Sequence, residues 1–336
     1  MTTEHIGVVG AGSWGTTLAN LLAKKGYRVT LWAYEPELVA EMSRSRVNTL
    51  FLPGVTLSEN LSLTNDLVAT VRDKSLVLFV SPSQVMRSVV GSCLPHLSED
   101  TLLVSASKGI ELGTLQTVSQ IMADLLPKAT MQRFSVLSGP SFAREVAQEM
   151  PTAVVAAATE TTVATRVQNI FSTDYFRVYT NRDMVGVEIG GSLKNVIAIA
   201  AGISDGLGFG HNTRAALITR GLAEMTRLGR AMGADASTFA GLAGMGDLVL
   251  TCTGDLSRNR TVGMKLGGGQ TLQEILAEMK MVAEGVKTAE SAHELAQRHG
   301  VDMPLTTKIY QILHQGKPAR TAVLELMSRD LKSEEI

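Results

Sequence analysis

The sequence has little cysteine and no histidine pattern of the kind that binds metal. Its 336 residues include two cysteines, Cys93 and Cys252, which lie far apart. Their number and spacing suit neither a disulfide framework nor a metal site, so we expect free thiols in a reducing compartment. The six histidines are scattered, and His293-Glu294 lacks the second histidine of a zinc-binding helix. We therefore predict a protein that binds no metal.

An excess of charge of one sign is also lacking, since 31 basic residues face 32 acidic ones. Without a polybasic run, the chain offers no electrostatic basis for binding nucleic acid or a membrane surface. No uncharged apolar stretch approaches the roughly 20 residues that span a bilayer. The opening residues MTTEHIGVV do not have the arrangement of a signal peptide. We expect a soluble, cytoplasmic protein with no nucleic-acid partner and no membrane insertion.

The first part of the chain alternates between short apolar runs and helical patterns. Apolar residues make up 45% of the chain, and its length is comfortable for two domains. Repeated strand-helix alternation predicts a doubly wound, mostly parallel sheet. The expected strands are 5–10, 27–32, 76–80, 101–105, 134–138, 153–157 and 176–180, and the expected helices between them include 14–25, 114–126 and 161–171.

The hydrophobic pattern of the sequence changes after residue 181, where runs of β-branched residues are replaced by long helical patterns. This change predicts a second, all-α domain. We therefore expect a nucleotide-binding α/β domain at 1–181 and a helical domain at 182–336. The expected helices of the second domain are 183–203, 213–232, 258–267, 271–280, 287–299, 304–314 and 318–328.

A glycine-rich hexapeptide, Gly10-Ala11-Gly12-Ser13-Trp14-Gly15, follows the first expected strand and opens the first expected helix. In that setting the first glycine permits a tight turn, the second lets the backbone approach a pyrophosphate, and the third lets helix and strand pack closely. The N-terminus of the helix adds unpaired N–H groups and partial positive charge. The pattern predicts a dinucleotide site, with a plain strand-helix turn as the alternative.

The choice between NAD and NADP rests on the end of the second strand. Glu35 lies 20 residues after Gly15, where a carboxylate would accept the ribose hydroxyls of NAD. Pro36 follows it, however, and proline favours the first turn of a helix, so Glu35 is equally a candidate helix cap. Since Tyr34 rather than a basic residue precedes it, the sequence leaves the preference open.

Lys194 stands inside an otherwise apolar helical stretch, which makes it the candidate general acid and base. Burial disfavours an ammonium group and brings the pKa of a lysine down toward working pH, where proton exchange is efficient. The neighbouring Gly190 and Gly191 would let this helix approach the nucleotide-binding domain closely. The alternative is a lysine whose head group reaches solvent along an apolar stem.

Two further polar residues follow positions where the backbone is expected to turn. Lys108 comes after the strand expected at 101–105, and ligands of doubly wound sheets gather beyond the carboxyl ends of the strands. It would polarise a carbonyl there, or else be a surface turn lysine. Asp247 follows the two glycines of the segment GMGDLV and would contact substrate hydroxyls or orient Lys194. An aspartate at such a place is otherwise a turn or helix-cap residue.

The segment LSRNR at 256–260 has the features of a phosphate site. Ser257 suits a helix N-cap, and a helical pattern follows it through Leu266. A helix N-terminus with Arg258 beside it attracts phosphate through its dipole, its N–H groups and a bidentate guanidinium. The alternative is an ordinary solvated start of a helix.

Six motifs occur in order along the whole chain: GAGSWGT (10–16), SASKGIE (105–111), LSGPSFAREV (137–146), GSLKNVIAIAAGISDGLGFG (191–210), GMGDLVLTCTGDLSRNR (244–260) and VAEGVKT (282–288). Together they resemble the soluble bacterial NAD(P)-dependent glycerol-3-phosphate dehydrogenases. The resemblance implies a Rossmann domain followed by a helical domain like that at the C-terminus of 6-phosphogluconate dehydrogenase. It also implies interconversion of dihydroxyacetone phosphate and sn-glycerol 3-phosphate with NAD(P)H for glycerophospholipid synthesis, by enzymes that are often homodimers.

The same resemblance implies roles for individual residues. The implied catalytic residues are Lys194, Lys108 and Asp247. The implied cofactor contacts are Gly10, Gly12, Ser13, Trp14, Gly15, Tyr34, Lys108, Ala143, Arg258, Val282 and Glu284. The implied substrate contacts are Lys108, Gly139, Ser141, Lys194, Asn195, Asp247, Thr251, Ser257, Arg258 and Asn259. Trp14 is expected against the nicotinamide half of the cofactor, in the cleft between the domains, or in packing.

Two other functions are compatible with parts of the pattern. A 2- or 3-hydroxy-acid dehydrogenase of the same two-domain architecture would need a carboxylate clamp, whereas the start of the helix at Ser257 suits a phosphate. A dinucleotide-sensing protein without turnover would leave Lys194, Lys108 and Asp247 without a task.

Overall fold

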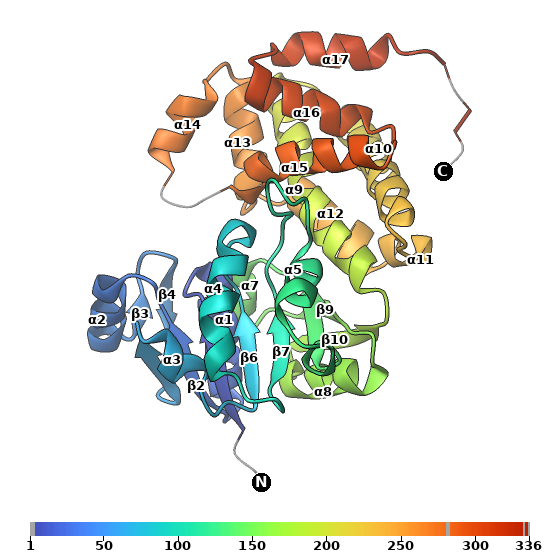
Figure 1. Cartoon of the computed structure of the whole chain (residues 1–336). Coiled ribbons are helices and arrows are strands. Elements are labelled where there is room, and N and C mark those ends of the chain that lie inside the picture. Colours follow the sequence, from blue (N-terminus) through green and yellow to red (C-terminus); the bar gives the residue numbers. More distant parts are fainter. Residues whose placement is uncertain (1–3, 280–282, 332, 335–336) are drawn as a thin grey trace. The chain divides into compact units, whose positions relative to one another are not determined.

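The structure is a computed structural model that describes residues 4–279, 283–331 and 333–334. Its contacts divide the chain into two compact units (Figure 1). The first unit comprises Met1–Ser107 and Val118–Met184, and the second comprises Lys108–Thr117 and Val185–Ile336. Lys108–Thr117 thus belongs to the helical unit. The predicted domain ranges, 1–181 and 182–336, instead placed this segment in the nucleotide-binding domain.

The first unit is built on an eight-stranded sheet with the strand order β10-β9-β8-β7-β6-β1-β2-β5. All neighbouring strands are parallel except β8 and β9, which pair antiparallel. Because β1 lies between β2 and β6, the order reverses there, and the carboxyl ends of β1 and β6 form the switch point at which such sheets bind ligands. The strands are β1 (His5–Val9), β2 (Arg28–Trp32), β5 (Leu61–Thr64), β6 (Leu76–Phe79), β7 (Leu102–Ser105), β8 (Phe134–Ser138), β9 (Thr152–Ala157) and β10 (Phe176–Asn181).

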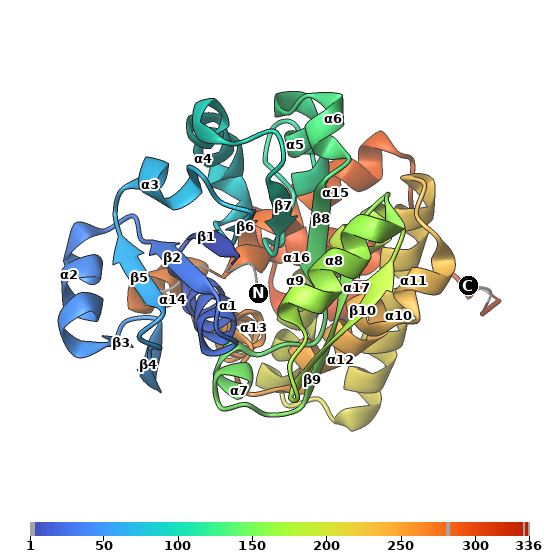
Figure 2. The same ribbon diagram turned by 90° about the horizontal axis from the view of Figure 1, so that it is seen from below.

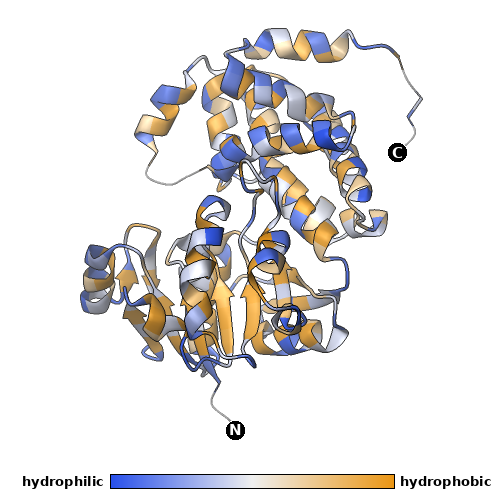
Figure 3. Cartoon of the chain, in the orientation of Figure 1, coloured by the Kyte–Doolittle hydropathy of each residue, from blue (hydrophilic) through white to orange (hydrophobic). Residues whose placement is uncertain are grey.

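Both faces of the sheet are apolar because helices cover both, as the predicted doubly wound fold requires. Leu76 and Leu78 of β6 pack in one core with helices α1 and α8. Val77 and Phe79 pack on the opposite face with α4 and α5. Figure 2 shows these helix pairs on either side of the sheet, and Figure 3 shows its central strands as strongly hydrophobic. The helices are α1 (Ser13–Lys24), α2 (Pro36–Ser45), α3 (Leu67–Val71), α4 (Met86–Cys93), α5 (Val118–Leu125), α6 (Lys128–Met131), α7 (Ala143–Ala147) and α8 (Thr161–Phe171), with the 3-10 turns η1 (Ser83–Val85) and η2 (Leu94–His96).

The seven strands expected from the sequence occur within one or two residues of their predicted bounds. Two features were not expected. One is the edge strand β5, and the other is a small antiparallel hairpin of β3 (Val47–Asn48) and β4 (Leu52–Thr56). β5, with the sequence LSLT, has only two apolar residues, β3 is two residues long, and β4 contains Pro53 and Gly54, which are unfavourable within strands. The helix expected at 114–126 is also shorter, because residues 108–117 join the other unit.

The second unit is helical, as predicted. Its longest helix, α9, has most of its residues buried, Lys194 and Asn195 among them. α9 has the length and hydropathy of a membrane span, yet 89% of its apolar 18-residue stretch is buried within the structure. The helices are α9 (Met184–Gly206), α10 (His211–Ala231), α11 (Ala236–Phe239), the π-helical turn η3 (Leu242–Gly246), α12 (Asp247–Thr253), α13 (Arg258–Gly267), α14 (Leu272–Glu278), α15 (Glu284–Arg298), α16 (Pro304–Gln315) and α17 (Ala319–Met327).

Helices α9 and α13 touch backbone to backbone. A Cβ on Gly202 of α9 would lie 2.0 Å from the carbonyl oxygen of Arg260, and one on Gly263 of α13 would lie 2.1 Å from that of Ile199. Only glycine tolerates such an approach. This contact holds the start of α13 close beside the helix that carries Lys194.

Candidate active site

The glycine loop of the first unit has the shape expected of a dinucleotide site. Gly10 follows β1 with a φ of 117°, and Gly12 is the N-cap of α1. A Cβ on Gly15 would lie 1.9 Å from the carbonyl oxygen of Gly10, whereas one on Gly12 would meet no atom within 4 Å. The open space over Gly12 lies at the positive end of a helix and at the switch point of the sheet, so the residues present fit a pyrophosphate.

The two variable positions of the hexapeptide make contacts within the first unit. The Ser13 hydroxyl donates a hydrogen bond of 2.6 Å to the carbonyl of Phe51. The Trp14 ring is partly buried against the apolar core, and its centroid lies 6.3 Å from that of Phe176. Trp14 therefore packs, and its contact with the cofactor stays a prediction.

The end of β2 presents two exposed side chains. Tyr34 is 78% exposed and stands edge-on to the ring of Trp32, with 6.1 Å between the centroids. Glu35 occupies the N-cap position of α2, and Pro36 begins that helix, as the alternative interpretation expected. The Glu35 carboxylate makes no capping hydrogen bond. Capping of α2 therefore does not occupy this carboxylate and would not compete with the binding of a ribose.

The segment after β8 carries the other sequence-predicted residues of the first unit. Gly139 has a φ of 144°, and the Ser141 hydroxyl donates to its carbonyl at 3.1 Å. Ala143 begins α7, and its carbonyl accepts a hydrogen bond of 3.2 Å from the Thr17 hydroxyl of α1. The turn after β8 is thereby tied to the helix that starts at the glycine loop.

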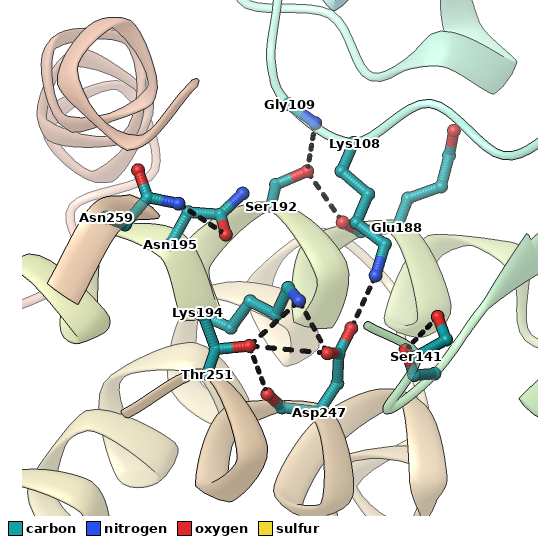
Figure 4. A network of polar contacts seen from close by, with 11 residues as sticks. Lys108, Gly109, Ser141, Glu188, Ser192, Lys194, Asn195, Asp247, Thr251 and Asn259 are labelled. Carbon is teal, nitrogen blue, oxygen red and sulfur yellow. Dashed lines mark hydrogen bonds and ion pairs between the residues drawn. The ribbon is translucent and has the colours of Figure 1, made fainter. Parts of the chain in front are cut away.

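Lys194, in the second unit, is buried as its apolar flanks predicted. Its Nζ donates to Asp247 Oδ1 at 2.5 Å and to Thr251 Oγ1 at 2.9 Å (Figure 4). Burial lowers the pKa of Lys194 to about 8, against an opposing effect of the Asp247 carboxylate. An amine with a pKa near neutrality exchanges a proton efficiently in either direction.

Asp247 joins both candidate lysines. Its other oxygen, Oδ2, accepts a hydrogen bond of 2.6 Å from Lys108 Nζ, and its side chain is 1% exposed. Lys108 opens a segment that is held against α9 by a 3.0 Å hydrogen bond from the Gly109 amide to the Ser192 hydroxyl. Two ammonium groups thus share one buried carboxylate, and the second positive charge of Lys108 further lowers the pKa of Lys194.

The predicted phosphate clamp stands at the start of α13. Ser257 is its N-cap and accepts from the Arg260 amide at 3.2 Å, so the predicted capping role is confirmed. Arg258 is exposed in the first turn. Asn259 is buried, and its Nδ2 donates to Asn195 Oδ1 at 3.0 Å. Its Oδ1 accepts the Gly285 amide, also at 3.0 Å.

The last predicted segment brings a carboxylate to this group. Glu284 begins α15 and is partly buried. Burial raises its pKa, and the positive charges of Arg258, Lys108 and Lys194 act in the opposite direction. These four side chains therefore form one electrostatic group. Val282, the other predicted contact here, lies outside the described residues.

Gly190 and Gly191 of α9 were expected to allow a close approach to the nucleotide-binding domain, and that approach stays a prediction. Within its own unit, a Cβ on Gly190 would lie 2.5 Å from the carbonyl oxygen of Ala243 in η3. The small residue makes room for the turn that leads into Asp247, and so helps to place that carboxylate beside Lys194.

The sequence analysis did not identify several residues that position the site but take no part in the proposed reaction. Ser192 precedes Lys194 by two residues in α9. Its hydroxyl accepts the Gly109 amide and so holds the segment that begins at Lys108. Asp205 accepts from both Arg214 and Arg260, which links α9, α10 and α13. Asn48 contacts the glycine loop. In the sequence, each of these is only a polar residue in an apolar or short segment, which local patterns do not distinguish from a surface residue.

Among the described residues, no three histidine, cysteine or acidic side chains are placed to hold a metal ion.

Comparison with known proteins identifies the family of this chain. The model of the NAD-dependent glycerol-3-phosphate dehydrogenase N-terminus matches residues 5–164, and that of the C-terminus matches 183–324. A glycerol-3-phosphate dehydrogenase [NAD(P)+] of Geobacter metallireducens is 71% identical over 98% of this chain and 99% of its own. One from Geobacter sulfurreducens is 69% identical over 99% of each chain. The crystal structure of glycerol-3-phosphate dehydrogenase from Coxiella burnetii has a TM-score of 0.93 at 42% identity, covering 97% of this chain and 99% of that one. The chain therefore belongs to the NAD(P)-dependent glycerol-3-phosphate dehydrogenase family.

Proposed function

We propose that this protein reduces dihydroxyacetone phosphate to sn-glycerol 3-phosphate with NAD(P)H, reversibly, with Lys194 as the general acid and base. The observation that carries the proposal is the buried Lys194 ammonium, held on Asp247 with a pKa near 8. A keto group that becomes an alcohol needs a proton at its oxygen, and a buried, oriented amine of that pKa supplies one.

NAD(P)H supplies the hydride when bound. The residues of this chain that would hold it are Gly10, Gly12 and Gly15 of the loop, with the N-terminus of α1 facing the pyrophosphate. Ser13, Trp14, Tyr34, Ala143 and Glu284 belong to the same proposal as further contacts.

Lys194 Nζ then has two tasks. As an ammonium it donates a hydrogen bond to the C2 oxygen of dihydroxyacetone phosphate, and it passes its proton to that oxygen as negative charge develops there. In the reverse direction the neutral amine removes the proton from the C2 hydroxyl of sn-glycerol 3-phosphate. Asp247 and Thr251 fix the direction of Nζ through the hydrogen bonds described above. Lys108 adds a second positive charge that favours an anionic oxygen at C2.

Ser257, Arg258 and Asn259 are proposed to bind the phosphate of the substrate, with Asn195 beside them. The helix start at Ser257 presents backbone N–H groups, and Arg258 offers a guanidinium that forms charge-assisted hydrogen bonds. Gly139 and Ser141 are the proposed substrate contacts of the first unit. A cytoplasmic location, a role in glycerophospholipid synthesis and a homodimeric state, all implied by the family resemblance, complete the proposal.

The test follows oxidation of NADH and of NADPH at 340 nm with dihydroxyacetone phosphate. The wild-type protein should turn over at least one cofactor, and the assay decides between them. Absorbance loss only with 2- or 3-keto acids would instead favour a hydroxy-acid dehydrogenase. No loss with any of these substrates would leave a nucleotide-sensing protein.

Two variants test the assigned roles separately. Lys194→Ala should abolish turnover while NAD(P)H still binds, and near-normal turnover at saturating substrate would remove Lys194 from its role. Arg258→Ala should raise KM for dihydroxyacetone phosphate by about 10- to 150-fold, because a charge-assisted hydrogen bond contributes about 1.5–3 kcal/mol. Dihydroxyacetone without the phosphate is the matched control, since its slower reduction should be insensitive to Arg258.

A further inference from the structure

A fully buried asparagine of the β3–β4 hairpin holds the glycine loop. Asn48 is 0% exposed and lies 37 residues after Ala11 in the chain. Its Nδ2 donates to the Ala11 carbonyl at 2.9 Å and to the Thr16 hydroxyl at 2.8 Å. Its Oδ1 accepts the Phe51 amide at 3.0 Å. Both amide protons and the amide oxygen are thus used, which fixes the orientation of the side chain.

The carbonyl that Asn48 holds belongs to the peptide between Ala11 and Gly12. The Thr16 hydroxyl donates to the same carbonyl at 3.1 Å. Among the described residues no peptide bond is cis, and in a trans peptide the C=O and N–H groups point in opposite directions. Because the Ala11 carbonyl is turned into the buried interior, the Gly12 N–H is turned the other way. That N–H therefore points away from the hairpin that holds the Ala11 carbonyl.

The hairpin holds the loop from both sides of Gly12. Asn48 binds Ala11, which precedes it, and the Phe51 carbonyl accepts the hydroxyl of Ser13, which follows it. Asn48 also binds the Phe51 amide, so one short segment of the hairpin sets both contacts. The direction of the Gly12 N–H is therefore decided by tertiary contacts as well as by the glycines of the motif.

We propose that Asn48 is a positioning residue for the cofactor, which sets the Ala11–Gly12 peptide so that the Gly12 N–H faces the pyrophosphate of NAD(P)H. It acts through that peptide and does not touch the cofactor. The inference rests on the proposed function, since it takes the glycine loop as the pyrophosphate site. Without the Asn48 amide, the Thr16 hydroxyl is the one donor left to the Ala11 carbonyl within the part of the chain that the structure describes. A flipped peptide would present an oxygen to the phosphates.

Asn20 provides a matched control within the same unit. It is a buried asparagine of α1 whose Nδ2 donates to the Thr56 carbonyl at 3.2 Å and whose Oδ1 accepts the Ser58 amide at 2.8 Å. It therefore ties α1 to the end of β4, on the same hairpin, with the same amide chemistry. It makes no hydrogen bond to the glycine loop among the described residues. Asn20→Ala should cost stability without changing the direction of the Gly12 N–H.

The experiment compares Asn48→Asp, Asn48→Ala and Asn20→Ala with the wild type. The aspartate variant keeps the shape and can still accept the Phe51 amide, but at neutral pH it cannot donate to Ala11. Kd values for NADH and NADPH come from nucleotide fluorescence. Kd for ADP-ribose, which has the pyrophosphate and lacks the nicotinamide, comes from competition. KM for dihydroxyacetone phosphate at saturating cofactor and Tm are measured on the same samples.

Both Asn48 variants should weaken NAD(P)H and ADP-ribose in parallel, by about tenfold or more, which corresponds to a lost charge-assisted hydrogen bond to phosphate. KM for dihydroxyacetone phosphate should stay within about twofold, since substrate binding does not use this peptide. Asn20→Ala should lower Tm and leave every Kd unchanged. Should both Asn48 variants unfold, Thr16→Val, which removes the second donor to Ala11, should weaken ADP-ribose by about threefold.

Two results would overturn the inference. One is a fall in Tm for the Asn48 variants, like that of Asn20→Ala, with unchanged Kd values, which would make Asn48 a purely structural residue. The other is weaker NAD(P)H with unchanged ADP-ribose, which would place the effect at the nicotinamide. A wild-type protein that binds neither cofactor nor ADP-ribose would refute the proposed function itself, and this is measured first.

Discussion

Replacing Asp247 by asparagine should move the ionisation of Lys194 to lower pH. The carboxylate accepts one lysine on each oxygen, at 2.5 Å from Lys194 and 2.6 Å from Lys108. Its side chain is 1% exposed and that of Lys194 is 10% exposed, so water screens the pair little. Asparagine keeps the volume of the side chain but removes the negative charge. The two ammonium groups would then face each other without compensation.

The size and sign of the shift follow from the environment of Lys194. Its pKa is lowered to about 8 by burial and by the charge of Lys108, while Asp247 raises it. An opposite charge at this range changes a pKa by about 1–3 units, so its removal should bring Lys194 to a pKa of about 5–7. Each unit corresponds to about 1.36 kcal/mol of differential interaction between the two protonation states.

The assay is the pH profile of kcat/KM in both directions. Reduction of dihydroxyacetone phosphate needs the ammonium, so it should fall as pH rises through about 8 in the wild type. Oxidation of sn-glycerol 3-phosphate needs the amine and should rise through the same pH. In Asp247→Asn both limbs should move together to a pH about 1–3 units lower, besides an overall loss of rate.

Lys108→Gln should move the same limbs of the pH profile to higher pH. The charge of Lys108 lowers the pKa of Lys194, so its removal should raise that pKa above 8. Opposite shifts in two variants that both lose activity cannot come from general damage to the site. An unmoved limb in Asp247→Asn, or shifts of the same sign in both variants, would refute Lys194 as the titrating acid and base.

Three further predictions concern stability and reactivity. Gly263→Ala would place a Cβ 2.1 Å from a carbonyl of α9, so it should lower the free energy of unfolding by about 1–3 kcal/mol and raise KM for dihydroxyacetone phosphate. Burial raises the pKa of Glu224 to about 6, so the folded state should lose about 2 kcal/mol of stability as pH rises from 4.5 to 6, and Glu224→Gln should flatten that slope in urea titrations. Burial raises the pKa of the Cys93 and Cys252 thiols to about 12, so both should react with a disulfide reagent only on unfolding.

Each of these has a result that would contradict it. Gly268→Ala, whose Cβ would lie 3.4 Å from its nearest neighbours, is the matched control, and equal losses for it and Gly263→Ala would exclude the backbone contact as the cause. If Glu224→Gln keeps the same dependence of stability on pH, other groups cause that dependence. Reaction of either thiol in the folded protein at neutral pH would show that the site is accessible.

Much of the fold was predictable because its signals are local. The N-cap at Ser257 and the start of α13 matched their predicted positions, since a capping side chain and a helical period lie within a few residues of each other. Burial of Lys194 followed from its apolar neighbours along one helix. The strand β5, with the sequence LSLT, was missed because only two of its residues are apolar, and the β3–β4 hairpin because β3 has two residues and β4 contains Pro53 and Gly54.

The assembly of the candidate site was not predictable in the same way. Asp247 lies 53 residues after Lys194 and 139 after Lys108, and no local pattern pairs residues so far apart. The antiparallel pairing of β8 with β9 and the return of Lys108–Thr117 to the helical unit are likewise properties of packing.

The sequence by itself determined the two kinds of domain, the glycine loop and the type of side chain at each proposed position, because hydrophobic period, capping and turn chemistry act over a few residues. Tertiary structure alone decided that Asp247 bridges Lys108 and Lys194 and thereby which charges set the pKa of Lys194. It also decided that Asn48 holds the Ala11 carbonyl. Electrostatic and hydrogen-bond partners depend on distances in space, and those exist only once the helices and strands have packed.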